Sequence, residues 1–370
     1  MTVRAVSSNP SSPYYNASAP TLTGQVGSLA AVLDAVLVNG FSGFTALGWT
    51  IGYTTTNKRA YLQNLTGANN ASGMYLYLDD TGPGAGAAKE ARACGFETMS
   101  AITPTGTGQF PTSAQSAVGV GTLVIRKSAT ADATARYWTI AGNGQTINLF
   151  IETGDQTVPA AAFPFVFGDF FSYKTSDSYA VAIIGRTAEN SSSPNIDWLH
   201  MIGPANSFIY MMANTHSGCF AARSWTGVGG SARIGKLIDR SKMGESHTSN
   251  TATPYMIGGW SADGGSQATI GTATFAIGRN ANISYFPYPN GPDGACWLSP
   301  IWINHNGSVR GYFKGLWAPL HDRPLNHNDS YTISGGNLSG KSIIAQAIPA
   351  FISGAIDVGQ IHVETSDTWS

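Results

Sequence analysis

The sequence predicts an all-β protein, built as a β-sandwich or jelly-roll-like set of antiparallel sheets, with an extended N-terminal arm and one short N-terminal helix. Three observations lead to this prediction. Short apolar segments rich in β-branched and aromatic residues recur from about residue 49 onward. Gly, Asn and Ser turns separate them at a spacing typical of sandwiches and barrels. Only one segment shows the apolar period of a helix.

Residues 1–20 are expected to form an extended arm. Pro10, Pro13 and Pro20 fall in this segment together with several serines, and prolines at this density disfavour a helix. Tyr14 and Tyr15 would anchor the arm either on a neighbouring subunit or on the chain's own domain. If the arm serves assembly, deletion of residues 1–20 should leave a folded protein that no longer assembles.

One amphipathic helix is predicted between Gln25 and Val38. Its apolar residues recur with the period of one helix face, and they are Leu29, Val32, Leu33, Val36 and Leu37. Gly40 follows at the position of a left-handed C-terminal cap. The apolar face would pack on the protein's own core or dock on a neighbouring subunit. The candidate interface therefore comprises Pro13, Tyr14, Tyr15 and the five apolar residues of the helix.

The strands are expected from Trp49 onward. Apolar runs at 75–78 and 123–125 predict strands, and the first ends at Asp79-Asp80. Two hairpins are predicted, with strands 135–141 and 145–152 around Asn143-Gly144, and strands 296–305 and 308–317 around Asn306-Gly307. Asn-Gly supplies the positive φ angles of a tight turn. The organisation is an arm with a helix at 1–40, a β-rich region at 41–160 and a sandwich at 161–370, or one continuous β domain over 41–370.

The composition stands out for its low charge. Asp, Glu, Lys and Arg make up 11% of the 370 residues, against about 25% in an ordinary domain. A surface of uncharged polar groups costs less to desolvate, which favours packing against neighbouring copies or other proteins. The net charge of −1 argues against a direct nucleic-acid partner. No apolar run approaches the ~20 residues that span a bilayer, so no membrane insertion is expected.

The cysteines and the opening residues bear on the compartment. Cys94, Cys219 and Cys296 are odd in number and far apart, so no disulfide framework is expected. The opening residues contain no apolar stretch of the kind found in signal peptides. The chain is therefore expected to stay in the cytoplasm where it is made, or in a particle assembled there.

A phosphate-loop pattern occurs near the C-terminus. Residues Gly335 to Ser342 fit G-x-x-x-x-G-K-[ST] letter for letter. A true site must open a helix in a parallel sheet, whereas the surrounding sequence predicts antiparallel β structure. In a chain with 44 glycines the match is interpreted as a β-turn, and no nucleotide or other cofactor is expected.

Several other polar residues are of the types found in catalytic or metal sites. His321, Asp322, His327 and Asp329 match no standard zinc spacing, and neither do His216 and Cys219. Asp79 and Asp80 are neighbours in a strand and point to opposite faces, so they do not make a carboxylate pair and are interpreted as turn residues. The prediction is a protein with no catalytic residue and no metal site.

Aromatic residues gather on the second hairpin. Trp297, Trp302, Tyr312 and Trp317 could stack on sugar rings, so they are the candidate glycan contacts. The alternative is that they belong to the hydrophobic core, as aromatic residues of β-sandwiches usually do.

Four stretches resemble segments of uncharacterised virion proteins of tailed bacteriophages. They are Asn9–Gly40, Ala91–Met99, Val309–His321 with Ser339–Lys341, and Glu364–Trp369. The resemblance covers most of the length in texture and order, and it carries no catalytic motif. It implies a β-rich particle component of the tail, baseplate or neck, and it transfers no functional residues.

These observations together predict a non-enzymatic structural component of a phage virion, assembled in the host bacterial cytoplasm in several copies together with other phage structural proteins. Hairpin surfaces and the N-terminal arm would hold the neighbours. One alternative is a module of the tail that binds a glycan or receptor on the host surface. Further alternatives are a capsid decoration protein and a polysaccharide-cleaving enzyme, which would need two carboxylates in a cleft.

Overall fold

The structure is a computed structural model of the chain. It describes residues 2–66, 71–116, 118–154, 162–186, 189, 219–227, 232–233, 235–236, 257–259, 268–270, 298–305, 308–319, 325–352 and 355–370. Every ladder between strands in these ranges is antiparallel, and the helical structure is one short helix with two single 3₁₀ turns. The predicted all-β class is therefore confirmed.

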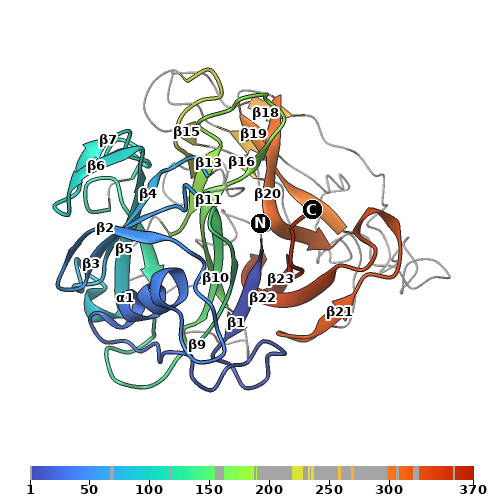
Figure 1. The fold of residues 1–370 in the computed structure, drawn as a ribbon, viewed down its shortest axis with the longest axis horizontal. Helices are drawn as coiled ribbons and strands as arrows, with labels where there is room; N and C mark the ends of the chain where they lie inside the picture. Colours follow the sequence, from blue (N-terminus) through green and yellow to red (C-terminus); the bar gives the residue numbers. More distant parts are fainter. Residues whose placement is uncertain are drawn as a thin grey trace.

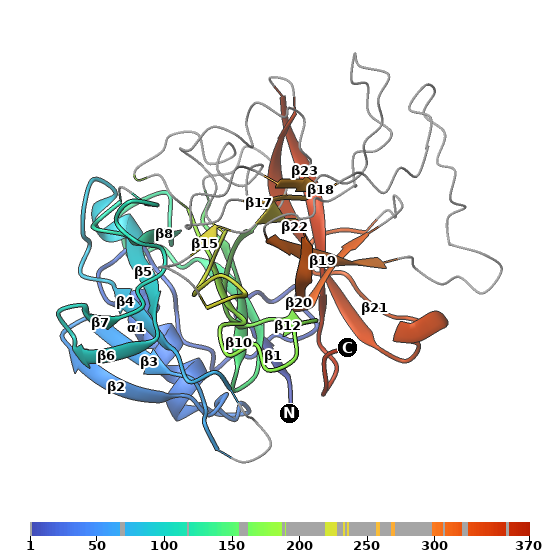
Figure 2. The ribbon, with the colours of Figure 1, turned by 90° about the horizontal axis from the view of Figure 1, so that it is seen from above.

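Three sheets form the body of the molecule, and Figures 1 and 2 show them side by side. The central sheet has the order β1 (Arg4–Ser7), β9 (Tyr137–Gly142), β10 (Thr146–Glu152), β11 (Phe163–Asp169), β13 (Val181–Ile184), β14 (Cys219–Ala221) and β15 (Ala232–Arg233). The helix-side sheet has the order β2 (Thr50–Thr55), β3 (Lys58–Leu62), β4 (Tyr75–Asp79), β5 (Glu90–Phe96) and β8 (Leu123–Arg126).

The outer sheet forms the third layer. Its order is β16 (Gly235–Lys236), β19 (Leu298–His305), β20 (Ser308–Pro319), β23 (Ala355–Glu364), β22 (Ser342–Ile352) and β21 (Ser330–Thr332). The short β12 (Phe171–Ser172) leaves the central sheet and pairs with β20. Two small hairpins lie beside these layers, β6 (Thr98–Ala101) with β7 (Thr105–Thr107) and β17 (Ile257–Gly259) with β18 (Ala268–Ile270).

The central sheet is covered on both faces, and its sequence shows why. Successive side chains of a strand point to opposite faces. On β10, Leu149 and Ile151 enter the core shared with the helix-side sheet, whereas Phe150 enters the core shared with the outer sheet. Because both faces are covered, β11 is a nearly continuous apolar run, and the polar residues Thr146 and Asn148 of β10 are buried as well.

The predicted helix is present with a later start. It comprises α1 (Ser28–Leu33) and continues as the π-helical turn η1 (Asp34–Asn39), ending at Gly40 with φ of 72°. Gly27 precedes it with φ of 80°, a left-handed conformation that glycine adopts without strain. The apolar face packs into the core between the helix-side and central sheets, where all five of its predicted residues are 0% exposed.

The N-terminal segment is extended, as expected, but it belongs to the chain's own domain. Strand β1 pairs with β9 along the edge of the central sheet. Its Ser7 exchanges backbone hydrogen bonds with residues 14 and 16, and the amide of Val3 donates to the carbonyl of Asp367. Because removal of residues 1–20 would take an edge strand from the central sheet, the structure argues against the prediction that the protein stays folded without them.

Both predicted hairpins are present. Gly142 pairs with Ile147 across β9 and β10, so residues 143–146 form the turn around Asn143-Gly144. His305 pairs with Ser308 across β19 and β20, and the two residues of that turn lie outside the described residues. Strands β9, β10 and β11 are consecutive in the central sheet, so a domain boundary near residue 160 would divide one hydrogen-bonded sheet.

Candidate functional site

The predicted interface residues separate into two groups in the structure. The apolar face of the helix is buried in the protein's own core, so it is not available to a neighbouring subunit. Pro13 is exposed and Tyr15 is 47% exposed. Tyr14 is half-buried against the outer core, and its hydroxyl lies 2.5 Å from Thr365 Oγ1. Of the predicted set, only Pro13 and Tyr15 lie on the surface.

The predicted glycan contacts are not a single cluster. Trp317 is 6% exposed, and its Nε1 donates to Glu364 at 3.3 Å, so its ring belongs to the core and cannot stack on a sugar. Trp302 lies on β19, but its side chain is outside the described part of the chain, as is all of Trp297. Tyr312 is half-buried on β20 and packs against two aromatic residues from elsewhere in the sequence.

Phe171, Tyr173 and Tyr312 form what we call the aromatic platform. The rings of Phe171 and Tyr312 stack with centroids 4.8 Å apart, and Tyr173 meets Phe171 edge to face at 5.3 Å. Phe171 is 40% exposed and Tyr173 is 55% exposed. The pairing of β12 with β20 places them together, because Phe171 lies directly opposite Tyr312. Three adjoining aromatic rings, two of them well exposed, form a contiguous apolar patch of the kind that marks binding sites.

A buried ion pair fixes the loop that carries the platform. Arg310 Nε and Nη2 each donate to the Asp177 carboxylate at 2.8 Å, and both side chains are 2% exposed. Ser172, between the two exposed aromatic residues, donates its hydroxyl to Asp177 at 2.7 Å. The Arg310 guanidinium also lies 5.1 Å from the ring centroid of Phe170. The platform is therefore held in place before any ligand arrives.

The electrostatics of this pair follow from its contacts. Burial pushes the pKa of Asp177 upward, but the hydrogen bonds and charge of Arg310 outweigh it, so the net pKa lies below the ordinary value. Burial raises the pKa of the Tyr312 hydroxyl, so that group stays protonated and can donate a hydrogen bond. Ring faces and hydroxyl donors can bind a ligand, whereas a carboxylate locked to an arginine cannot serve as an acid or base.

The sequence reasoning missed Phe171 and Tyr173. A signal was present in Phe170-Phe171-Ser172-Tyr173, where Phe170 is 3% exposed and its neighbour Phe171 is 40% exposed. An alternating run that places two aromatic side chains on the polar side of a strand would have indicated a surface site.

The phosphate-loop pattern is a turn, as interpreted from the sequence. Its glycines surround the 3₁₀ turn η4 (Gly336–Leu338), and the chain then enters strand β22 instead of a helix. Lys341 pairs with Glu364 at 2.9 Å. A phosphate loop needs backbone N–H groups at the start of a helix, and no helix follows this turn.

The histidine and cysteine candidates make ordinary contacts where they are described. His327 Nδ1 accepts the amide of Ala347 at 3.1 Å, so Nε2 carries the proton that reaches Glu152 at 3.0 Å. Asp329 accepts the amide of Asn326, and Cys219 is buried in β14. His216, His321 and Asp322 lie outside the described residues, as does Cys296. Within the ranges that are described, no three His, Cys, Asp or Glu side chains gather as a metal site.

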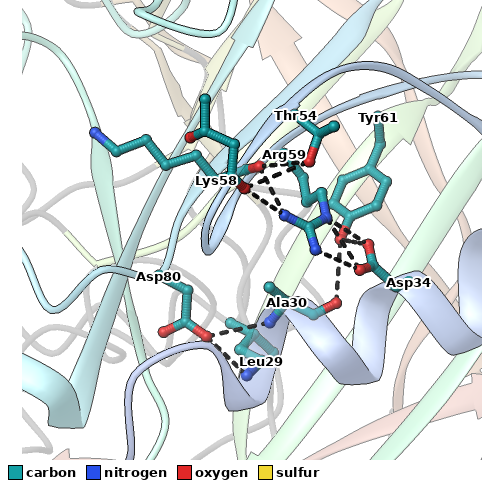
Figure 3. Close-up of polar contacts among 9 residues, drawn as sticks. Leu29, Ala30, Asp34, Thr54, Lys58, Arg59, Tyr61 and Asp80 are labelled. Atoms are coloured by element: carbon teal, nitrogen blue, oxygen red, sulfur yellow. Dashed lines mark hydrogen bonds and ion pairs between the residues drawn. The ribbon is translucent and has the colours of Figure 1, made fainter.

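Asp80 has a larger role than a turn residue, which corrects the sequence interpretation. It is 0% exposed, and its Oδ2 accepts the backbone N–H groups of Leu29 at 2.8 Å and Ala30 at 3.1 Å, as Figure 3 shows. One turn further along the same helix, Asp34 accepts hydrogen bonds from Arg59 and from the Tyr61 hydroxyl. These contacts anchor both turns of the helix on strands β3 and β4.

Comparison with known proteins gives no family for the chain. No protein-family model matches it, and no curated protein matches it in sequence. Among the described residues, no helix has the length and apolar character needed to cross a membrane.

Proposed function

We propose that this chain is a non-enzymatic structural component of a tailed-phage particle that binds carbohydrate on the host surface through the aromatic platform. The observation that carries the binding role is the stack of Phe171, Tyr173 and Tyr312, held by the buried Asp177–Arg310 pair. Sugar rings present C–H groups on their faces, and these pack favourably on aromatic rings at low entropic cost when the rings are already fixed.

The structural role is supported by the body of the molecule. The central sheet is covered on both faces, and its edge strand β1 lies beside the C-terminal residues. Such a body changes shape little on binding, which suits a protein that holds a place among neighbours. The proposed place is the tail, baseplate or neck, with several copies assembled through surfaces that include Pro13 and Tyr15.

The binding role is tested with an array of bacterial surface polysaccharides, followed by calorimetry on any hit. We expect the Tyr173→Ala variant to lose about 5- to 150-fold in affinity, if a sugar ring stacked on an aromatic side chain contributes the roughly 1–3 kcal/mol found for stacked nucleic-acid bases. Tyr137→Ala is the matched control, since Tyr137 is 43% exposed and lies across from Glu152 at the far end of β10. Equal affinity in both variants, or no hit for the intact chain, would refute the carbohydrate role.

The structural role needs a separate measurement. Light scattering on the purified chain, repeated after mixing with particles that lack it, should show a discrete oligomer or incorporation into the particles. A monomer that ignores the particles contradicts the structural role and leaves the carbohydrate result unaffected.

A further inference from the structure

Asp80 and Lys127 form a lysine–carboxylate contact whose two side chains are each 0% exposed. Asp80 follows β4 and Lys127 follows β8, and β5 lies between these two strands. Lys127 Nζ donates to Asp80 Oδ1 and to the carbonyl of Gln25. The second carboxyl oxygen, Oδ2, faces away from the lysine and accepts the N–H groups of Leu29 and Ala30.

The remaining ion pairs of the described residues differ from this one in chemistry or in burial. Arg126 and Arg310 also pair with buried carboxylates, but a guanidinium stays protonated and is not a nucleophile. Lys58 and Lys341 carry amines, yet they are 32% and 21% exposed, so water stabilises their charged form. In this set, Lys127 combines an amine with complete burial.

We propose that Lys127 and Asp80 are joined by an intramolecular isopeptide bond between Nζ and Cγ. Burial raises the pKa of Asp80 and lowers the pKa of Lys127, which favours transfer of a proton from the amine to the acid. The neutral amine and the neutral carboxyl are the two forms that react to give an amide.

The bond forms by loss of one water, and no other reactant is needed. The Nζ lone pair attacks Cγ, and the electrons of the C=O bond move onto Oδ2. There the N–H groups of Leu29 and Ala30 stabilise the negative charge, as donors of an oxyanion hole do. The carbonyl then reforms and Oδ1 leaves as water, which takes the proton of the carboxyl and one of the two amine protons.

The surrounding hydrogen bonds suit the product as well as the ion pair. The amide oxygen, formerly Oδ2, still accepts from Leu29 and Ala30, and the remaining N–H still reaches the carbonyl of Gln25. The amide also removes two charges from a region with no access to water, where a charge pair is costly to hold. The link would tie β4 to β8 across β5 and fix the start of α1.

The test is peptide mapping of the intact, purified chain by mass spectrometry after denaturation and trypsin digestion. We expect the peptides that contain Asp80 and Lys127 to appear joined, at about 18 Da below their summed mass, as an amide formed with loss of water requires. Trypsin should also fail to cleave after Lys127. The peptides of Lys341 and Glu364 serve as an internal control and should remain separate.

Two variants sharpen the result. Lys127→Arg keeps the positive charge but cannot form the amide, so its peptides should separate. Asp80→Asn should give the same linked product by expelling ammonia, with a final mass identical to that of the linked original chain. If the original chain, shown to be folded by a cooperative thermal transition, yields both peptides unlinked at full mass, the contact is an ordinary ion pair and the proposal is overturned.

Discussion

The two faces of the central sheet are closed in different ways. On the helix side, the apolar face of α1 and residues such as Tyr61, Leu76 and Phe167 form one continuous hydrophobic cluster. On the outer side, buried polar residues lie among the apolar ones, and they include Asn148 and Gln346. The helix side is therefore held mainly by burial of apolar area, and the outer side depends more on specific hydrogen bonds.

Two buried ion pairs also differ between the helix side and the outer side. Asp80 and Lys127 connect parts of the helix-side layer with one another. Asp177 and Arg310 connect different layers, since Asp177 lies in the loop that leads into β13 of the central sheet and Arg310 lies on β20 of the outer sheet. Besides their shared apolar core, the central and outer sheets are therefore joined by oriented polar contacts, and the aromatic platform lies at one of them.

The largest expected effect is that of removing β1, whose side chains pack in the cores on both faces of the central sheet. Val6 belongs to the helix-side core, and Ala5 packs against the outer core. Deletion of residues 2–20 should cost more than about 5 kcal/mol, which is the whole stability of many domains, and abolish the cooperative thermal transition. Circular dichroism during heating measures this. A melting temperature within a few degrees of that of the full chain would contradict this prediction and support residues 1–20 as an arm that is not needed for folding.

A pair of neighbouring core residues compares the two faces directly. Leu149 points to the helix side and Phe150 to the outer side of the same strand. Truncation of a buried leucine or phenylalanine to alanine costs about 2–5 kcal/mol. We expect Leu149→Ala to cost at least as much as Phe150→Ala despite the smaller side chain, because the helix-side core is closed by a helix and two sheets. Urea unfolding of both variants tests the order, and a clearly larger loss for Phe150→Ala contradicts it.

The smallest expected effect concerns acid and the outer attachment. The pKa of Asp177 is lower in the folded protein than in the unfolded chain, so its contribution is present above about pH 4 and is lost as pH falls through the folded value. Asp177→Asn should cost about 3 kcal/mol at neutral pH, at the lower end for a broken buried pair. The reason is that Arg310 keeps the carbonyls of Tyr179 and Arg223 as acceptors.

Stability of the Asp177→Asn variant should also depend less steeply on pH below about pH 4 than that of the original chain, because one titrating group is gone. Chemical unfolding at a series of pH values measures the slope. Parallel slopes for the two proteins would show that Asp177 does not carry this acid dependence. Asp367→Asn is a suitable control, because Asp367 is an exposed aspartate near the C-terminus.

Local patterns in the sequence predicted the features that depend on local chemistry. The β class, both hairpins and the helix follow from side-chain period and from Asn-Gly turns, which act within a few residues. The pairing of β1 with β9 and the contact of Phe171 with Tyr312 join residues more than a hundred positions apart. No local pattern specifies such partners, and for this reason the pairing of β1 with β9 and the aromatic platform were not predicted.

Asp80 illustrates the same limit for a single residue. Two adjacent aspartates at a strand end are typical of a turn, and nothing nearby indicates that the second is buried against Lys127 and a helix start. Its environment is created by three segments that meet only in the folded state. The composition also did not indicate this burial. The chain has few charged residues, yet several of them lie in its interior.

The contact between Val3 and Asp367 brings the two ends of the described chain together. A short peptide joining them would close the backbone into a ring without moving either strand. New ends could then be opened in the tight turn at Asn57, which connects β2 and β3. In such a rearranged chain β1 would follow directly after the outer sheet, so the contact between Val3 and Asp367 would join residues close in sequence and would cost little loop-closure entropy.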